Sequence, residues 1–260
     1  MLKTIKELIE YREVLITLVI RDIKVRYKQT IVGAVWAVLQ PIFMMWIFSI
    51  IFDKFTNLPS EGAPYYIFCL TALVPWTFFT NSINLAIPSL VDNESLITKI
   101  YFPREFLPLS GICAAMIDFL IAAILYILVL LMAKIKVTLL IFMVLPLFMI
   151  QLLFTIGIVL FAAALNVFYR DVKFIIPFVI QIGMFATPIV YSTVMISDKY
   201  KSMYMLNPLA GLIDGYRKVI LAGVMPNPQY LGNAFWVSAA VFIFGYAYFK
   251  FVEASFADAV

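Results

Sequence analysis

Apolar runs recur along the whole length of this 260-residue chain, and short polar segments separate them. A helix needs about 20 consecutive, mainly apolar residues to cross the hydrocarbon core of a membrane, and these runs are long enough. They predict six membrane-spanning helices, at residues 31–52, 65–90, 107–133, 138–168, 174–192 and 231–252. The expected fold is therefore an all-α integral membrane domain over residues 31–260.

The first 30 residues follow a different pattern, because charges interrupt every apolar stretch. Their apolar positions recur at steps of three and four, as on one face of a helix. These positions are Leu2, Ile5, Leu8, Ile9, Ile16, Val19, Ile20, Ile23 and Tyr27. The pattern predicts an amphipathic segment over residues 1–30, of one or two helices, that lies at the cytoplasmic membrane interface; a packed soluble helix is the alternative.

Composition and charge restrict the class of protein. Hydrophobic residues make up 64% of the chain and charged residues 13%, against roughly 45–50% and about 25% in soluble domains, which excludes a soluble globular protein. The net charge of +4 bears on orientation, because Lys and Arg gather on the cytoplasmic side of membrane spans. With both termini in the cytoplasm, twelve of the 19 Lys and Arg residues lie inside. We therefore expect cytoplasmic termini and no nucleic-acid partner.

Catalytic chemistry has little support in the sequence. Histidine is absent, and no GxxxxGK[ST] motif is present to cradle nucleotide phosphates. Cys69 and Cys113 lie inside apolar runs and provide neither a disulfide framework nor metal-ligand spacing. We expect a chain that is not an enzyme and binds no metal or cofactor, so that any ATP chemistry comes from a partner.

Asp118 is the one ionisable residue placed well inside a predicted span. A carboxylate at this depth is expensive unless it is paired, and it often has a function. The sequence places no basic residue at a similar depth, so the expected partners are polar residues of neighbouring spans. Candidates are Asn81, Ser82, Asn84 and Asn166. A structural hydrogen-bonding role is favoured over ion coupling.

Two predicted spans carry aromatic and amide residues on single helical stripes. The first stripe is Trp36, Gln40 and Phe43, and the second is Phe174, Phe178, Gln181, Phe185 and Pro188. Amides bond to hydroxyl groups and aromatic faces suit the apolar faces of sugar rings, so these stripes are candidate walls of a conduit for a polar polymer. Helix packing and interfacial aromatic belts are the alternative.

The segment between the fifth and sixth predicted spans indicates a further helix. Asn207 is a candidate N-cap, Pro208 suits the first helical position, and Gly223 is a candidate stop. Asp214 lies three and four residues before Arg217 and Lys218, a spacing that pairs charges on one helix face. The opposite face is apolar and contains Leu209, Leu212, Ile213, Tyr216 and Ile220. We interpret this helix as a lid over an outer exit, with an interfacial anchor as the alternative.

Four stretches of the sequence together resemble the permease subunits of ABC-2-type transporters, and among them the exporters of O-antigen, teichoic acid and capsule. They are RDIKVRYKQTIVGAVWAVLQP (residues 21–41), LITKIYFPREFLPLS (96–110), FYRDVKFIIPFVIQIGMFATPIVY (168–191) and LNPLAGLIDGYRKVIL (206–221). The resemblance covers nearly the whole chain, and it rests on the order and spacing of these stretches.

The resemblance implies a homodimer of six-span permeases in the bacterial cytoplasmic (inner) membrane, joined to two copies of a cytoplasmic ABC ATPase that binds ATP and Mg²⁺. The implied substrate is an undecaprenyl-linked polysaccharide, and a drug or lipid is the alternative. The loop after the second span is implied to couple to the ATPase, and the LNP segment to form short outer gate helices. Coupling residues are Asp92, Asn93, Glu94, Lys99 and Tyr101, and gate residues are Asn207, Pro208, Asp214, Tyr216 and Arg217. An intramembrane enzyme or a scaffold without transport is less favoured.

Overall fold

The computed structural model describes residues 11–28, 33–55, 59–136 and 138–259, and every regular element in these ranges is helical. Five helical segments are long and apolar enough to cross a membrane: Trp36–Asp53, Tyr65–Ala86, Phe106–Met132, Leu139–Phe168 and Pro228–Ser255. They contain, in order, α3 (Trp36–Phe48) with η2 (Ser49–Phe55), α4 (Tyr65–Ala86), α6 (Phe106–Met132), η4 (Leu139–Met143) with α7 (Val144–Phe168), and α11 (Pro228–Val252). The expected all-α membrane fold is confirmed.

The fifth expected span is shorter than predicted. Its helix, α8, covers Val172–Phe185, and residues 186–192 that complete the apolar run are not helical. Fourteen residues rise about 21 Å, less than a hydrocarbon core of roughly 30 Å. Pro188 accounts for the ending, because a proline disfavours helical geometry at the residue before it, here Thr187. The structure therefore has five long candidate spans and one shorter apolar helix among its described residues.

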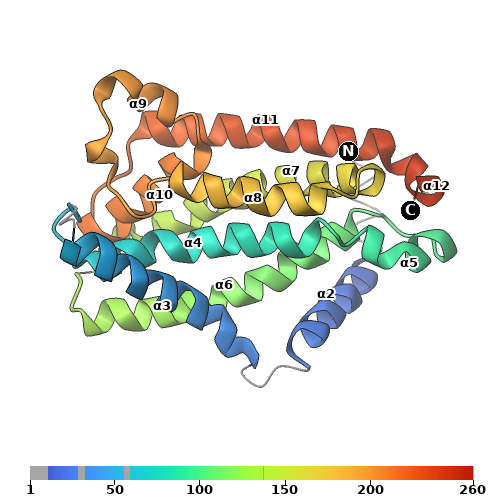
Figure 1. Ribbon diagram of the computed structural model, residues 1–260, viewed down its shortest axis with the longest axis horizontal. Helices are drawn as coiled ribbons and strands as arrows, with labels where there is room; N and C mark the ends of the chain where they lie inside the picture. Colours follow the sequence, from blue (N-terminus) through green and yellow to red (C-terminus); the bar gives the residue numbers. More distant parts are fainter. Residues whose placement is uncertain (1–10, 29–32, 56–58, 137, 260) are drawn as a thin grey trace.

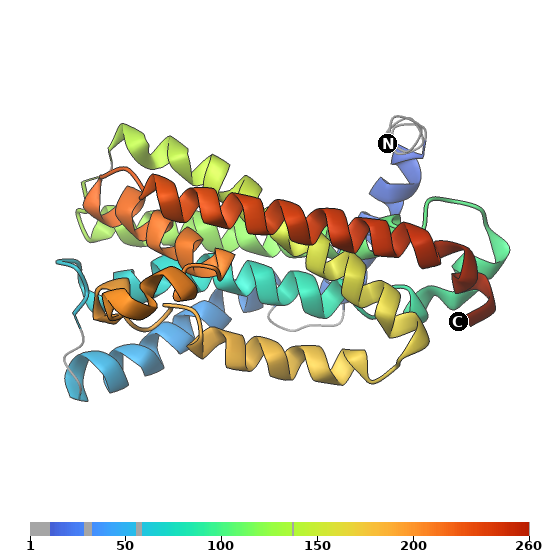
Figure 2. The ribbon, with the colours of Figure 1, turned by 90° about the horizontal axis from the view of Figure 1, so that it is seen from above.

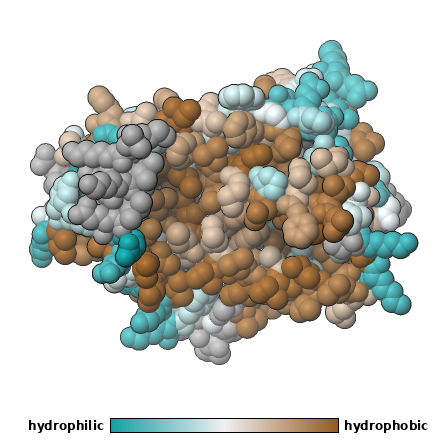
Figure 3. All heavy atoms as spheres, turned by 180° about the vertical axis from the view of Figure 1, so that it is seen from behind, coloured by the Kyte–Doolittle hydropathy of each residue, from teal (hydrophilic) through white to brown (hydrophobic). Residues whose placement is uncertain are grey.

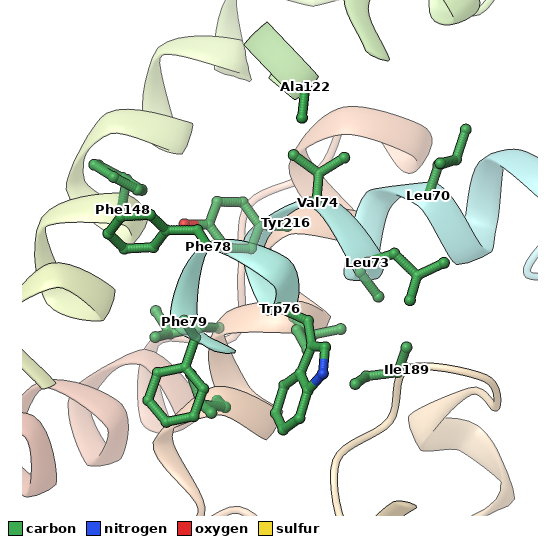
Figure 4. Close-up of a cluster of buried hydrophobic side chains, with 14 of the residues drawn as sticks. Leu70, Leu73, Val74, Trp76, Phe78, Phe79, Ala122, Phe148, Ile189 and Tyr216 are labelled. Carbon is green, nitrogen blue, oxygen red and sulfur yellow. The ribbon is translucent and has the colours of Figure 1, made fainter. Parts of the chain in front are cut away.

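Helix α4 forms the centre of the bundle. It lies between α3 and α6 on one side and α7, α8 and α10 (Pro208–Arg217) on the other (Figure 1). Nearly every residue of its first four turns is buried, and Figure 4 shows its side chains pointing toward α6, α7 and α10. Phe78 of α4, Phe119 of α6 and Phe148 of α7 form an aromatic cluster with ring centroids 4.6–5.4 Å apart.

Helices α7 and α11 pack side by side through facing glycines. A Cβ atom on Gly157 would lie 2.6 Å from the Cα of Phe242, and one on Gly245 would overlap the carbonyl oxygen of Gly157. Small residues let the backbones of membrane helices approach closely. This contact fixes α11 against the core.

The polar connection after α4 lies at one end of the bundle, and it contains η3 (Val91–Asn93) and α5 (Glu94–Lys99). The same end also holds α2 (Arg12–Tyr27), η7 (Glu253–Ser255) and α12 (Phe256–Ala259), and α12 lies beside α5 (Figure 1). A second core cluster joins α2, the α5 region, α7 and α11 here. Lys250 bridges Glu105 and Glu253, each at 2.9 Å, and so ties the end of α11 to the segment after α5.

The predicted N-terminal helix is described from Arg12 onward, and residues 1–10 and 29–30 of that prediction lie outside the described residues. Helix α2 packs on α6 and buries Leu18, while the expected apolar positions Ile16 and Ile20 are 54% and 46% exposed. The predicted apolar stripe is therefore divided: Ile16 and Ile20 face away from the bundle, whereas Tyr27 bonds to Asp118 of α6.

Candidate transport site

The first aromatic and amide stripe lies on α3, and the bundle does not cover it. Trp36 is 54% exposed, Phe43 is 53% exposed, and Gln40 between them is also exposed. The opposite side of α3 packs on α4 and buries Ala37, Val38 and Pro41. The predicted stripe is therefore a real face of the helix, and it points away from its own chain.

The second stripe has the same character on α8. Phe174, Phe178 and Phe185 are 68%, 63% and 57% exposed, and Gln181 is exposed on the same helix. Pro188 does not continue this stripe, because it is buried beyond the end of the helix. Helices α3 and α8 lie along the same side of the molecule, with α6 and the first half of α7 on the other side (Figure 2). An exposed amide is costly against hydrocarbon, so this side is a candidate surface for a polar substrate.

The predicted helix after the fifth span exists, but the bundle surrounds it. Every residue of α10 is buried, and the helix packs against α4, α7 and α11 at the end of the bundle away from α5 (Figure 1). The side chain of Asn207 accepts a hydrogen bond from Leu209 N at 3.1 Å, Pro208 is the first helical residue, and Gly223 ends the π-helical turn η6 (Lys218–Ala222) with φ of 63°. The cap and stop predictions are confirmed, whereas a lid with only one buried face is wrong.

Two glycines let α10 pack closely inside the bundle, because glycine has no side chain. A Cβ atom on Gly211 would lie 3.1 Å from the carbonyl oxygen of Tyr230, and one on Gly215 would lie 2.9 Å from a methyl group of Leu147. Asn207 also donates to Thr187 Oγ1 at 3.0 Å. The start of α10 is thereby tied to the segment that follows α8.

The predicted charge pairing on α10 is confirmed for Lys218 but not for Arg217. Asp214 forms an ion pair with Lys218 at 2.8 Å and accepts a hydrogen bond from Thr193 at 2.7 Å. Arg217 instead lies 3.5 Å above the ring centre of Phe68 and donates to the carbonyl oxygens of Ile189 (2.7 Å) and Tyr191 (3.1 Å). The guanidinium therefore binds the segment after α8. That segment is not helical, so its carbonyl oxygens are not used in helix hydrogen bonds and can accept from Arg217.

Gln151 is a buried polar residue whose role the sequence reasoning missed. It accepts a hydrogen bond from the Tyr216 hydroxyl at 3.0 Å and donates to the carbonyl oxygen of Pro75 at 2.7 Å. One amide thus joins α10, α7 and α4. The available signal was a lone glutamine in an apolar run, the same signal that identified Gln40 and Gln181.

The predicted coupling segment is exposed at the other end of the bundle. Asp92, Glu94 and Lys99 are exposed and Tyr101 is 82% exposed, around the short helix α5. Asn93 is partly buried, because its side-chain oxygen accepts from Arg21 of α2 at 2.7 Å. The segment therefore offers a polar surface and is tied to α2 at its start.

The structure overturns the expected surroundings of Asp118. A basic partner does exist, since Arg26 lies 2.7 Å from its carboxylate, and the Tyr27 hydroxyl donates to the same carboxylate. Among the expected partners, Asn166 bonds instead to the carbonyl oxygen of Ile87 at 3.4 Å. Burial, followed by the bond to Asp118, raises the pKa of Tyr27 to about 12, so Tyr27 stays a neutral donor. These partners come from α2, which lies along α6 although it is far from Asp118 in the sequence.

Comparison with known proteins identifies the family. A family model described as ABC-2 type transporter matches residues 13–221, which is most of the chain. The chain belongs to the ABC-2 type transporter family. This confirms the resemblance of the four sequence stretches, and it makes the chain a multi-pass membrane transport subunit rather than an enzyme.

Individual relatives of this ABC-2 permease match it over most or all of its length. An O-antigen export system permease protein from Klebsiella pneumoniae is 29% identical to this chain. The match spans 94% of that protein and 95% of this chain. One from Myxococcus xanthus is 28% identical over the full length of both chains. A polysialic acid transport protein from Escherichia coli is 23% identical over 79% of this chain and 80% of its own.

Proposed function

We propose that this ABC-2 permease exports a lipid-linked polysaccharide, with O-antigen as the first candidate, across the bacterial cytoplasmic membrane. The observation that carries the proposal is the similarity to O-antigen export permeases over 94–100% of their lengths. Exposed amide and aromatic residues on α3 and α8 support it, because such a surface suits sugar hydroxyls and ring faces.

We further propose that two copies of the chain bring their α3 and α8 sides together around the conduit. A face with exposed Gln40 and Gln181 is better matched to a polar path than to lipid. In this arrangement α8 and the segment after it complete the sixth crossing, and both termini lie in the cytoplasm, at the α5 end. Two ABC ATPase subunits bind ATP and Mg²⁺ and dock on the surface that contains Glu94, Lys99 and Tyr101.

The direct test is ATP hydrolysis by the permease reconstituted in vesicles with its ATPase. We expect undecaprenyl-linked glycan to stimulate hydrolysis by a factor of several, and a panel of apolar drugs and lipids to have no effect. Stimulation by drugs or lipids alone would assign the chain to the other substrate class. A Gln40→Leu, Gln181→Leu variant should lose the glycan response, while Gln229→Leu, at the exposed start of α11, serves as the matched control.

A further inference from the structure

A pocket with a volume of about 370 Å³ lies between α4, α6, α7 and the α10–η6 segment. It is near the α10 end of the bundle, at the level of Thr71 and Pro75 in α4 and of Tyr126 in α6. Its outer rim belongs to α6, η4 and the start of α7, and these helices lie on the side of the molecule away from α3 and α8 (Figure 2). The conduit and the coupling surface therefore do not use it.

The opening of the pocket is apolar and faces sideways out of the spans. Ile127 of α6, Phe142 of η4 and Leu145 of α7 line it and are 54%, 75% and 65% exposed. All three belong to candidate membrane spans. Seen from behind, this side of the bundle is a broad apolar surface between polar ends (Figure 3). The pocket therefore opens where hydrocarbon surrounds the protein.

The hydroxyl groups in the pocket wall already have partners. Thr71 and Tyr126 share a hydrogen bond of 2.6 Å, and the Tyr216 hydroxyl donates to Gln151 at 3.0 Å. A ligand with polar groups would gain no unpaired partner from them and would lose its own hydration. An apolar chain has no hydrogen bond to lose on entry and fills space that water would occupy poorly.

We propose that this pocket binds one acyl chain of a bilayer phospholipid, from the leaflet at the α10 end. The choice of a lipid over a second copy of the chain rests on the proposed placement of the conduit at α3 and α8. Tyr216 and Ile220 form the part of the wall that belongs to the α10–η6 segment. The bound chain therefore supports the buried α10 helix from the lipid side, and it is distinct from the exported substrate.

The site can be tested with a phospholipid that carries a diazirine near the end of one acyl chain. The permease and its ATPase are reconstituted in nanodiscs with this lipid and irradiated, and labelled residues are mapped by mass spectrometry. Tyr126 and Tyr216 are only 7% and 3% exposed, so lipid that merely surrounds the protein does not reach them. We expect label on one or both, without glycan or ATP. Absence of label on both overturns the proposal, and it is the result expected if a second copy covers the pocket.

Matched variants separate occupation of the pocket from general lipid contact. Ala123→Phe places a ring inside the pocket and should reduce labelling of Tyr126 and Tyr216 at least fivefold. Ile124→Phe adds bulk on the neighbouring, 62% exposed position outside it and should leave labelling unchanged. Equal labelling in both variants overturns the proposal.

Competition separates the two sources of a hydrocarbon chain. Excess polyprenyl phosphate should not displace the label, and displacement would assign the pocket to the substrate's own tail. Because labelling needs no glycan, a failure of glycan-stimulated ATP hydrolysis with intact labelling would reject the proposed export function and leave the lipid site standing.

Discussion

Single buried polar residues join distant parts of this permease. Asp118 holds Arg26 and Tyr27 of α2 against α6, and Gln151 joins α4, α7 and α10. Burial of a polar side chain is costly unless it is hydrogen-bonded. A polar residue inside an apolar run therefore indicates a buried hydrogen-bond or ion-pair partner elsewhere in the chain. The sequence identified Asp118 as hydrogen-bonded but named the wrong partners, polar residues of neighbouring spans instead of Arg26 and Tyr27, because helix periodicity describes one helix and not the contact between two.

Removal of the Asp118 carboxylate should weaken the attachment of α2. We expect Asp118→Ala to lower the free energy of unfolding by about 1–3 kcal/mol, because Arg26 and Tyr27 lose a buried acceptor while Arg26 keeps some contact with solvent. The double variant Arg26→Met, Asp118→Leu should recover part of this loss, since it leaves no unpaired charge. Denaturation in detergent measures both.

Asp198, which is fully exposed and lies 3.9 Å from Lys201, provides the matched control for these variants. Asp198→Ala should leave stability unchanged, because ion pairs in water contribute little. Equal stability of Asp118→Ala and the parent protein would show that the Asp118 cluster does not anchor α2.

At the level of whole helices, capping residues and prolines predicted where a helix begins and ends better than they predicted which elements pack around it. The Asn-Pro start of α10 and its stop at Gly223 follow from cap chemistry, and Asn227 with Pro228 begins α11 in the same way. The burial of α10 on every side was not predictable from its own residues, because Asp214 and Arg217 find their partners in the segment after α8 and in η6 rather than in water. The early end of α8 could have been read from Pro188.

The crossing of α7 and α11 gives a prediction at the level of one helix pair. Gly245→Ala should lower the thermal midpoint of the permease by several degrees, because the added methyl group meets the backbone of α7 at Gly157. Gly232→Ala, on the same helix with open space around it, should be neutral or slightly stabilising. Similar midpoints for the two variants would mean that the backbones can separate without cost.

The coupling segment gives a second prediction at this level. Glu94→Lys with Lys99→Glu reverses exposed charges on α5 and should lower glycan-stimulated ATP hydrolysis or assembly with the ATPase. Membrane insertion should stay intact, because neither side chain is buried in the bundle. Co-purification with the ATPase and hydrolysis by the complex are the measurements. Wild-type values for both would remove this segment from the docking surface.

At the scale of the whole molecule, the exposed stripes of α3 and α8 lie on one side of the bundle, and the apolar pocket opens on the other side. Hydropathy predicted the helical membrane fold and five of its spans, and the helical spacing of aromatic and amide residues predicted the stripes on α3 and α8, apart from Pro188. Neither pattern could show that these two stripes share a side, nor that α2 lies along α6 and α10 enters the bundle, because all three depend on contacts between distant segments.

Chemical labelling tests whether the shared side of α3 and α8 faces a polar path. In a background with Cys69 and Cys113 replaced by Ala, cysteine at Gln40 or Gln181 should react with a membrane-impermeant thiol reagent in the assembled complex. Ile124→Cys, exposed on the α6 side, is the control and should stay protected by lipid. Protection of both Gln40→Cys and Gln181→Cys, with export intact, would favour helix packing as the role of the stripes.

We propose that the start of α10 closes the exit of the conduit. An exporter with a path wide enough for a sugar polymer must be closed at rest, and α10 is held in the bundle at its start by Asn207, which caps it and bonds to Thr187 after α8. Asn207→Ala removes a cap worth about 0.5–2 kcal/mol together with this link, enough to shift a closed state several-fold toward an open one. We expect faster passive leakage of ions or small solutes from vesicles that contain this variant with its ATPase.

The second Asn-Pro start provides the control for this experiment. Asn227 caps α11 through Gln229 N at 2.9 Å, with the same chemistry as Asn207. Asn227→Ala therefore loses a comparable cap without touching the segment after α8, and vesicles with it should stay as tight as those with the parent protein. Leakage from both variants would indicate general loosening of the bundle. Tight vesicles with Asn207→Ala would mean that α10 closes the exit through its buried contacts alone, or that the exit lies elsewhere in the molecule.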